Sequence, residues 1–280
     1  MNYTLRSILL HLDPSPRCAV RLRLARAIAA QHEAQVTALY AVTPTFLALP
    51  LAMGDGSAAM VPMLEQIDAD RRAAARSLFD REQAVGQGAM RWADLGIEPV
   101  IPAFSAQALF ADLLVLGQHD PGDAETAGVP VDFVESVLVA TGKPALVVPY
   151  AGEFTEVGRD VLIAWKSTRE AARAVACALP LLQHARSVHV VGWSADATGP
   201  DAGRLDLAAY LLLHGVEPKV RYHSSAPVEV GAGLLSLAAD VGADLLVMGA
   251  YGHSRARELV LGGATRTILR SMTVPVLMAH

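Results

Sequence analysis

The residues with the clearest chemical content lie in the last quarter of the chain, directly after a short apolar run. Four glycines precede a small residue and a threonine there, with the spacing G-x2-G-x9-G-G-A-T: Gly249, Gly252, Gly262, Gly263, Ala264 and Thr265. Glycine at a strand exit permits positive φ and close approach of a ligand to the backbone. The first N–H groups of the helix that follows have no partner within it and attract anions. The pattern therefore indicates a phosphate chain between two glycine turns, with the Thr265 hydroxyl donating to it.

Purely structural interpretations of these residues stay open. Glycines that follow strands are often turn residues only. His253, Arg255 and Arg257 lie inside the nine-residue spacer, either in a solvated loop or against a phosphate tail. Glu258 is the only carboxylate of the spacer, and hydrolysis would need an oriented water and usually a metal. We therefore expect no catalytic residues, and hydrolysis of a phosphate ligand that is slow at most.

Other reactive motifs are sparse. The sequence contains no G-x-G-x-x-G, P-loop, G-x-S-x-G or H-E-x-x-H pattern. His119, Asp120 and Asp123 lie in a loop rich in proline and glycine, where such residues are typical of turns, so no metal site is expected. Cys18 and Cys177 are interpreted as core thiols in a reducing compartment.

The elements that must position the glycines alternate between strand and helix. In the second half we expect five strands and four helices: strands at 160–165, 187–193, 218–224, 244–249 and 275–279, and helices at 168–184, 200–215, 228–241 and 264–271. The apolar runs do not alternate with polar residues, which is typical of parallel strands buried on both faces. Ser167 to Glu170 fits a capping box, and Ser15-Pro16 fits a helix start.

The chain repeats itself. The heptapeptides that begin at Ala111 and Ala243 are nearly identical and lie 132 residues apart, whereas the opening strands at Ile8 and Val161 lie 153 residues apart. A repeat of this length indicates duplicated domains rather than a solenoid. We expect an α/β protein with two doubly wound parallel-sheet domains in tandem, residues 1–152 and 153–280. The first domain carries an insertion near 43–60 and a long polar-faced helix at 59–87.

Composition excludes several classes of function. Of the 280 residues, 52% are hydrophobic and 18% are charged, which excludes disorder. A formal net charge of −5 argues against a nucleic-acid partner. The longest apolar stretch, residues 41–53, contains two prolines and is shorter than the ~20 residues that span a bilayer. A soluble, cytoplasmic protein without a membrane partner is expected.

The glycine spacing resembles the signature of the universal stress protein family, and the resemblance covers the chain as a tandem pair of its domains. It implies an adenine nucleotide alpha-hydrolase-like fold that holds ATP or a related adenine nucleotide, with Mg²⁺ left open. The site residues expected from the motif and the resemblance together are Ala164, Trp165, Lys166, Val190, Val191, Met248, Gly249, Gly252, His253, Gly262, Gly263, Ala264 and Thr265. Trp165 has packing as an alternative role. The resemblance also implies that 144–149 and 275–279 pair antiparallel within the chain; a homodimer stays open.

The sequence departs from the family pattern in both halves. Gly263 replaces the usual Ser/Thr, and Lys166 replaces an acidic residue that recognises the nucleoside; a lysine cannot accept a hydrogen bond but could reach a phosphate. In the first half Asp13 keeps the acidic position, but the loop from Gly117 to Gly122 lacks the required glycine spacing. We therefore expect that the first half has lost its nucleotide site.

Two functions follow from these patterns. The leading one is a stress-response protein that binds an adenine nucleotide in its second domain as a regulatory ligand. The alternative is an interaction scaffold without nucleotide, or a stress protein that binds an apolar ligand or an unknown protein partner. Its support is the apolar insertion with Phe46, Leu47, Leu49 and Leu51, which could cover a partner surface or an apolar pocket.

Overall fold

The computed structural model describes residues 4–45, 60–86, 88–123, 128–193, 206–223, 227–251 and 263–280. Most of the insertion expected at 43–60 lies outside these residues, as does the whole nine-residue spacer at 253–261. The account below concerns the described residues.

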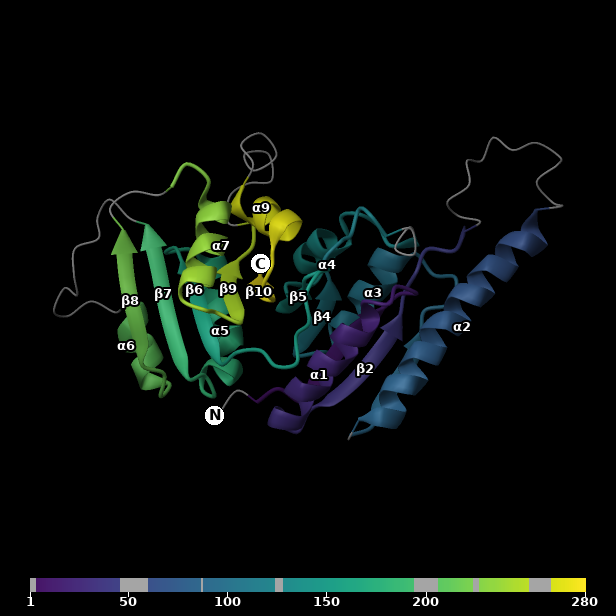
Figure 1. The fold of residues 1–280 in the computed structure, drawn as a ribbon, viewed down its shortest axis with the longest axis horizontal. Helices are drawn as coiled ribbons and strands as arrows, with labels where there is room; N and C mark the ends of the chain where they lie inside the picture. Colours follow the sequence, from purple (N-terminus) through teal and green to yellow (C-terminus); the bar gives the residue numbers. More distant parts are fainter. Residues whose placement is uncertain are drawn as a thin grey trace.

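Ten strands form one sheet in the order β3-β2-β1-β4-β5-β10-β9-β6-β7-β8 (Figure 1). In the first half the strands are β1 Ser7–Leu12, β2 Gln35–Tyr40, β3 Met90–Asp94, β4 Leu113–Gly117 and β5 Ala145–Val148. In the second half they are β6 Asp160–Trp165, β7 Ser187–Trp193, β8 Pro218–His223, β9 Leu245–Gly249 and β10 Val276–Ala279. Each half therefore supplies five strands, and the two fold-equivalent sets meet at the centre of the sheet.

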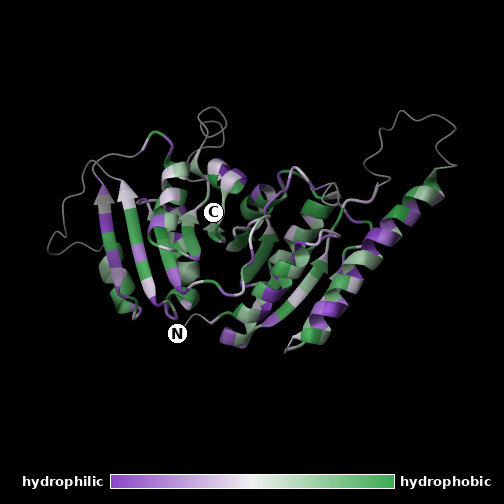
Figure 2. Cartoon of the chain, viewed as in Figure 1, coloured by the Kyte–Doolittle hydropathy of each residue, from purple (hydrophilic) through white to green (hydrophobic). Residues whose placement is uncertain are grey.

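Helices cover both faces of this sheet. Apolar side chains of α1 Cys18–His32, α2 Val61–Val85, α5 Arg169–Leu182 and α6 Leu207–Leu213 join one core cluster. Those of α3 Val100–Ala108, α4 Phe133–Thr141, α7 Val230–Asp240 and α9 Ala264–Ser271 join the other. The strands between them carry long apolar runs, such as the buried Leu245–Met248 segment, because both of their faces are covered (Figure 2). The expected fold of two doubly wound α/β domains is confirmed.

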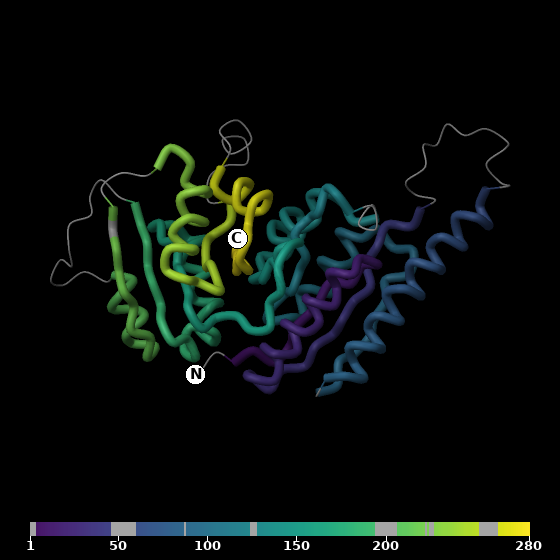
Figure 3. The backbone as a smooth tube through the Cα atoms, in the orientation of Figure 1, coloured from purple at the N-terminus to yellow at the C-terminus, as the bar shows by residue number. Residues whose placement is uncertain are grey.

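The two halves are joined through their last strands. β10 pairs antiparallel with β5, with Val276 opposite Val147 and Met278 opposite Ala145, which confirms the expected pairing of 144–149 with 275–279. The other strand pairs of the sheet are parallel. The chain therefore ends in the middle of the molecule, between its two halves (Figure 3). The boundary that we propose at 152/153 lies in the connection from β5 to β6.

Helix starts differ from the expectation by one or two residues. Thr168, not Ser167, is the N-cap of α5, and its hydroxyl accepts from the N–H of Ala171 at 3.3 Å. α1 begins at Cys18 rather than after Ser15, because the Ser15 N–H donates to the Asp13 carboxylate at 2.8 Å and holds the chain in a turn. The long helix expected at 59–87 is confirmed as α2. No helix of the described residues is long and apolar enough to cross a membrane.

Candidate functional site

The second half has one point where neighbouring strands send their chains in opposite directions. β6 and β9 lie side by side, with Ala164 opposite Met248. β6 continues into α5 on one face of the sheet, whereas β9 leads toward α9 on the other face. Open α/β sheets bind ligands at the carboxyl ends of strands at such a switch point. The fold thus brings the expected residues Trp165, Lys166 and Gly249 to one edge of the sheet.

Gly249, the last residue of β9, is required for space. A Cβ added there would lie 2.5 Å from the backbone nitrogen of Ala171 and 2.7 Å from the carbonyl carbon of Glu170. The first turn of α5 therefore lies directly against the end of β9. The positive φ expected at this strand exit falls on Tyr251 (φ 57°) rather than on Gly249. Gly249 therefore allows a helix to pack closely against the end of β9. The glycine spacing in the sequence cannot distinguish this role from close approach of a ligand.

Thr265 lies in the first turn of α9 and is only 3% exposed. Its Oγ1 accepts a hydrogen bond from the backbone N–H of Tyr251 at 3.4 Å, which ties the start of α9 to the exit of β9. The hydroxyl proton is not used in that bond, so the same group can donate to a ligand. Gly263 is the N-cap residue, with φ −59° and ψ 152°, and Ala264 follows as the first helical residue. The first-turn N–H groups of α9 have no acceptor within the helix.

The apolar residues expected at the nucleotide wall are divided by the sheet. Ala164, Val191 and Met248 belong to the core face that α7 and α9 cover. Val190 and Trp165 belong to the opposite face, with α5 and α6. A single wall of the site therefore cannot include both groups.

Sequence reasoning missed an aromatic pair near this edge. Trp193, the last residue of β7, packs on the same face as Met248, and its ring stacks on that of His223 at 6.3 Å. The signal in the sequence that could have indicated this pair is a tryptophan at the end of a predicted strand, as for Trp165. Lys166 is exposed beyond the end of β6. Gly252, His253 and Gly262 lie outside the described residues.

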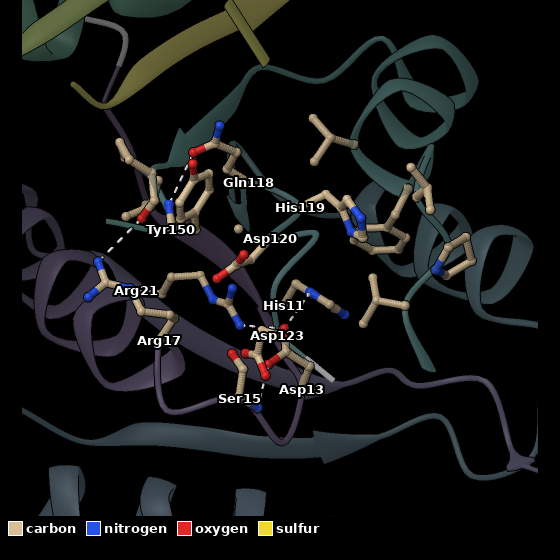
Figure 4. Close-up of a pocket in the computed structure, with 18 residues that line it drawn as sticks. His11, Asp13, Ser15, Arg17, Arg21, Gln118, His119, Asp120, Asp123 and Tyr150 are labelled. Atoms are coloured by element: carbon tan, nitrogen blue, oxygen red, sulfur yellow. Dashed lines mark hydrogen bonds and ion pairs between the residues drawn. The ribbon is translucent and has the colours of Figure 1, made fainter. Parts of the chain in front are cut away.

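The equivalent switch point of the first half lies between β1 and β4 and holds a cavity of about 30 Å³ (Figure 4). A buried ion pair fills much of this site. Arg21 of α1 donates from Nη2 to Oδ2 of Asp13 at 2.6 Å, and the two side chains are 5% and 4% exposed. The thiol of Cys18 donates to the Asp13 backbone carbonyl at 3.1 Å. The remaining volume suits about one water molecule.

Gly117 of the first half has the repeat position of Gly249 but a different neighbour. A Cβ added at Gly117 would lie 1.8 Å from Nη1 of Arg21. The missing side chain therefore makes room for a guanidinium group. We infer that the first half fills its own switch point with an arginine, and that the Asp13 carboxylate is committed to that arginine.

Burial and charge set the protonation of this cluster. Burial would raise the pKa of Asp13, but the Arg21 guanidinium and neighbouring groups hold it at about 2. Burial lowers the pKa of His11 to about 4, although Asp13 opposes this. Burial likewise raises the pKa of the Cys18 thiol to about 12. His11 is therefore neutral at pH 7, with Nε2 2.8 Å from the Ala41 carbonyl oxygen and the ring against Phe133.

Gln118 connects the first-half site to the second half. Its Nε2 donates to the Leu269 carbonyl in the last turn of α9 at 2.9 Å, and its Oε1 accepts from the Tyr150 N–H at 3.1 Å. The last carbonyls of a helix have no partner within it, so Gln118 satisfies one of them. Sequence reasoning missed His11, Arg21 and Gln118.

His119, Asp120 and Asp123 also line the first-half cavity (Figure 4). Among the described residues, no group of three or more His, Cys, Asp or Glu side chains is placed to hold a metal ion.

Comparison with known proteins agrees with this architecture. Fold and site together define a tandem α/β protein with a switch point in each half, the first of which is filled by the Asp13–Arg21 ion pair. Residues 159–280 match the model of the universal stress protein family. A universal stress protein of Synechocystis is 59% identical over 34 residues, which are 12% of each chain.

Two solved structures are similar over nearly the whole chain. A universal stress protein from Archaeoglobus fulgidus aligns with 99% of this chain and 96% of its own, with 14% identity and a TM-score of 0.71. A putative universal stress protein from Pseudomonas aeruginosa aligns with 98% of this chain and 93% of its own, with 15% identity and a TM-score of 0.56. At these identities the likeness shows the fold.

Replacing Gly249 with alanine should destabilise the protein by ~1–3 kcal/mol, because a Cβ would force α5 away from the end of β9. Urea unfolding followed by circular dichroism measures the change. Gly122→Ala is the matched control: its Cβ would come no closer than 3.4 Å to a neighbour, and we expect less than ~0.5 kcal/mol. Equal stability of Gly249→Ala and wild type would contradict the close packing.

Replacing Arg21 with methionine should cost ~3–5 kcal/mol, since it leaves a buried Asp13 carboxylate without its cation. Adding Asp13→Asn should recover part of that loss, because no charge is then buried. Unfolding of the two single variants and the double variant forms a thermodynamic cycle. Additive losses would show that the two groups do not interact.

His11 should make stability depend on pH between 6.5 and 4. Its folded pKa of about 4 lies below the ordinary histidine pKa of 6.5, so between these values the unfolded chain binds a proton there that the folded chain does not. The contribution of neutral His11 to the free energy of unfolding is complete above pH 6.5 and is lost as the pH falls toward 4. The loss is ~3 kcal/mol, since one pKa unit corresponds to about 1.4 kcal/mol. Denaturant unfolding from pH 7.5 to 4.5 should show a shallower slope in His11→Gln, whose amide can still donate to Ala41. A slope in His11→Gln equal to that of the wild type would contradict a buried, neutral His11.

Proposed function

We propose that the second half binds an adenine nucleotide, ATP or a close relative, as a regulatory ligand of a stress-response protein. The supporting observation is the arrangement at the β6/β9 switch point. Thr265 is buried in the first turn of α9, and the Tyr251 N–H fixes its hydroxyl in position. N–H groups without an acceptor in their own helix, a positive helix end and an oriented hydroxyl together suit a phosphate oxygen.

The chemistry of the neighbouring residues suggests how the nucleotide lies. Its phosphates would meet the N–H groups of Gly263, Ala264 and Thr265, with Gly252, His253 and Gly262 completing the loop. Lys166 would add a cation for a phosphate, since it cannot accept from a ribose hydroxyl. The base would pack on the face that Ala164, Val191 and Met248 share, and this arrangement leaves Val190 and Trp165 as core residues.

The first half, on this proposal, holds no nucleotide. Its cavity of about 30 Å³ is far below the ~300–1,000 Å³ of small-molecule sites. Its acidic residue, Asp13, is paired with Arg21. The hydrogen bond from Gln118 to the Leu269 carbonyl offers a route by which occupancy at the start of α9 acts on the first half.

An observation also favours the second function, a scaffold that covers an apolar partner surface. Val61 and Met63, at the start of α2, are 42% and 64% exposed and directly follow the apolar insertion. Deletion of residues 46–59 discriminates between the two functions. Lost association with another protein, at unchanged nucleotide affinity, would favour the scaffold. A reducing compartment such as the cytoplasm would suit both, since Cys18 and Cys177 are free thiols.

Isothermal titration with ATP, ADP and AMP, each with and without Mg²⁺, tests the nucleotide proposal. We expect one site per chain. Thr265→Val should raise Kd by about tenfold or more, the equivalent of one hydrogen bond to a charged group. Thr265→Ser should bind within about threefold of wild type, because serine keeps the hydroxyl. Valine keeps the shape of threonine but lacks the hydroxyl, so the two variants separate the hydrogen bond from the packing.

Absence of binding at millimolar nucleotide would refute the proposal. Equal affinity of the valine and serine variants would place the phosphates away from α9. Thermal unfolding of each variant without nucleotide shows whether the substitution has disturbed the fold.

A further inference from the structure

A second cavity lies at the junction of the two halves, away from both switch points. Its volume is about 480 Å³, within the ~300–1,000 Å³ typical of small-molecule sites. The first half contributes residues that precede β1, β4 and β5, at the amino ends of these strands. The second half contributes residues of α5 and α6 and the residue that directly follows each of these helices. The candidate nucleotide site is at the carboxyl ends of strands, so the two sites are distinct.

Two cations belong to this interdomain cavity, one from each half. Lys143 follows the end of α4, and Arg173 lies on the exposed side of α5. Both act electrostatically on the thiol of Cys177, which lines the same cavity. The charges of Lys143 and Arg173 therefore act on the same cavity. The one lining carboxylate, Asp112, accepts from the backbone N–H groups of Arg6 and Ser7 at 2.9 and 3.0 Å. The lining side chains therefore carry two positive charges and one negative charge, and Arg173 also donates from Nη1 to the His280 carbonyl oxygen at 3.1 Å.

The rest of the lining is largely apolar. Leu5 and Leu179 are 3% and 6% exposed, and Pro144, which directly precedes β5, is also buried. Tyr210 of α6 contributes an aromatic ring that packs on the His214 ring, with centroids 4.7 Å apart. Apolar walls with a few convergent polar groups are characteristic of sites for organic ligands.

We propose that this interdomain cavity binds a small organic anion with a flat apolar body. The body packs on Leu5, Pro144 and Tyr210, and the acidic group pairs with Lys143 and Arg173. The pairing needs both halves of the chain, so the ligand bridges them. A guanidinium and an ammonium together favour a carboxylate, sulfonate or phosphate over a neutral group of the same shape.

Naphthalene-2-sulfonate is the probe for the intact protein, with 2-naphthylmethanol as its neutral counterpart and inorganic phosphate as the anion without an apolar body. Isothermal titration should show one sulfonate site per chain, and at least tenfold weaker binding of the other two compounds. Lys143→Met with Arg173→Met should weaken sulfonate binding at least tenfold. Arg81→Met, on the exposed side of α2, should leave it unchanged. Equal affinity in all of these proteins, or no binding of the sulfonate, would overturn the proposal.

Cys177 reports where the probe binds. The other cysteine of the chain, Cys18, is 0% exposed, so iodoacetamide should modify Cys177 selectively in the folded protein. Saturating sulfonate should slow this modification at least fivefold, as measured by mass spectrometry of the Cys177 peptide. An unchanged rate would place the probe elsewhere and refute the assignment. Thr265→Val should bind the sulfonate like wild type, which separates this proposal from that of the nucleotide site.

Discussion

The antiparallel pairing of β5 with β10 is the interaction on which the arrangement of the molecule depends. Both strands are buried along their whole length, and each bonds on its other side to a parallel strand of its own half. In either half alone, an apolar strand that is buried in the whole protein would form an open edge of the sheet. Such an edge favours pairing with a strand of another molecule. Joining the halves removes both edges at once. It also creates the interdomain cavity and places α9 beside Gln118.

The two halves share one fold, but their switch points are occupied differently. The position at which the first helix of each half begins accounts for the difference. In the second half three residues separate the end of β6 at Trp165 from the start of α5 at Arg169, so the first turn of α5 fills the space beside Gly249. In the first half five residues separate the end of β1 at Leu12 from the start of α1 at Cys18. The later start leaves room beside Gly117, and the Arg21 guanidinium occupies it. A repeated glycine therefore meets a helix backbone in one half and a side chain in the other.

Local patterns were sufficient to predict the elements of this chain. The strands expected at 160–165 and 187–193 and the helix expected at 264–271 coincide with β6, β7 and α9, because continuous apolar runs and helical spacing determine them. Side-chain direction was not predictable in this way. Nothing in the pattern of α1 distinguishes Arg21, which is buried, from Arg23, which is exposed, or Arg26, which is half-buried. Cys177, predicted as a core thiol, is only half-buried because the junction of the halves lies beside it.

The position of α9 gives the proposed nucleotide a physical means of regulation. The helix has eight residues, so its ends lie ~12 Å apart at 1.5 Å per residue. Thr265 at one end meets the exit of β9, and the Leu269 carbonyl near the other end meets Gln118 of the first half. A ligand shifts a conformational equilibrium only by its difference in affinity for the two states. A phosphate that binds the N–H groups of α9 favours the helix position that presents them best. Gln118 bonds to the Leu269 carbonyl of α9 and to the Tyr150 N–H of the first half, so a change in the position of α9 would act on the first half through this side chain.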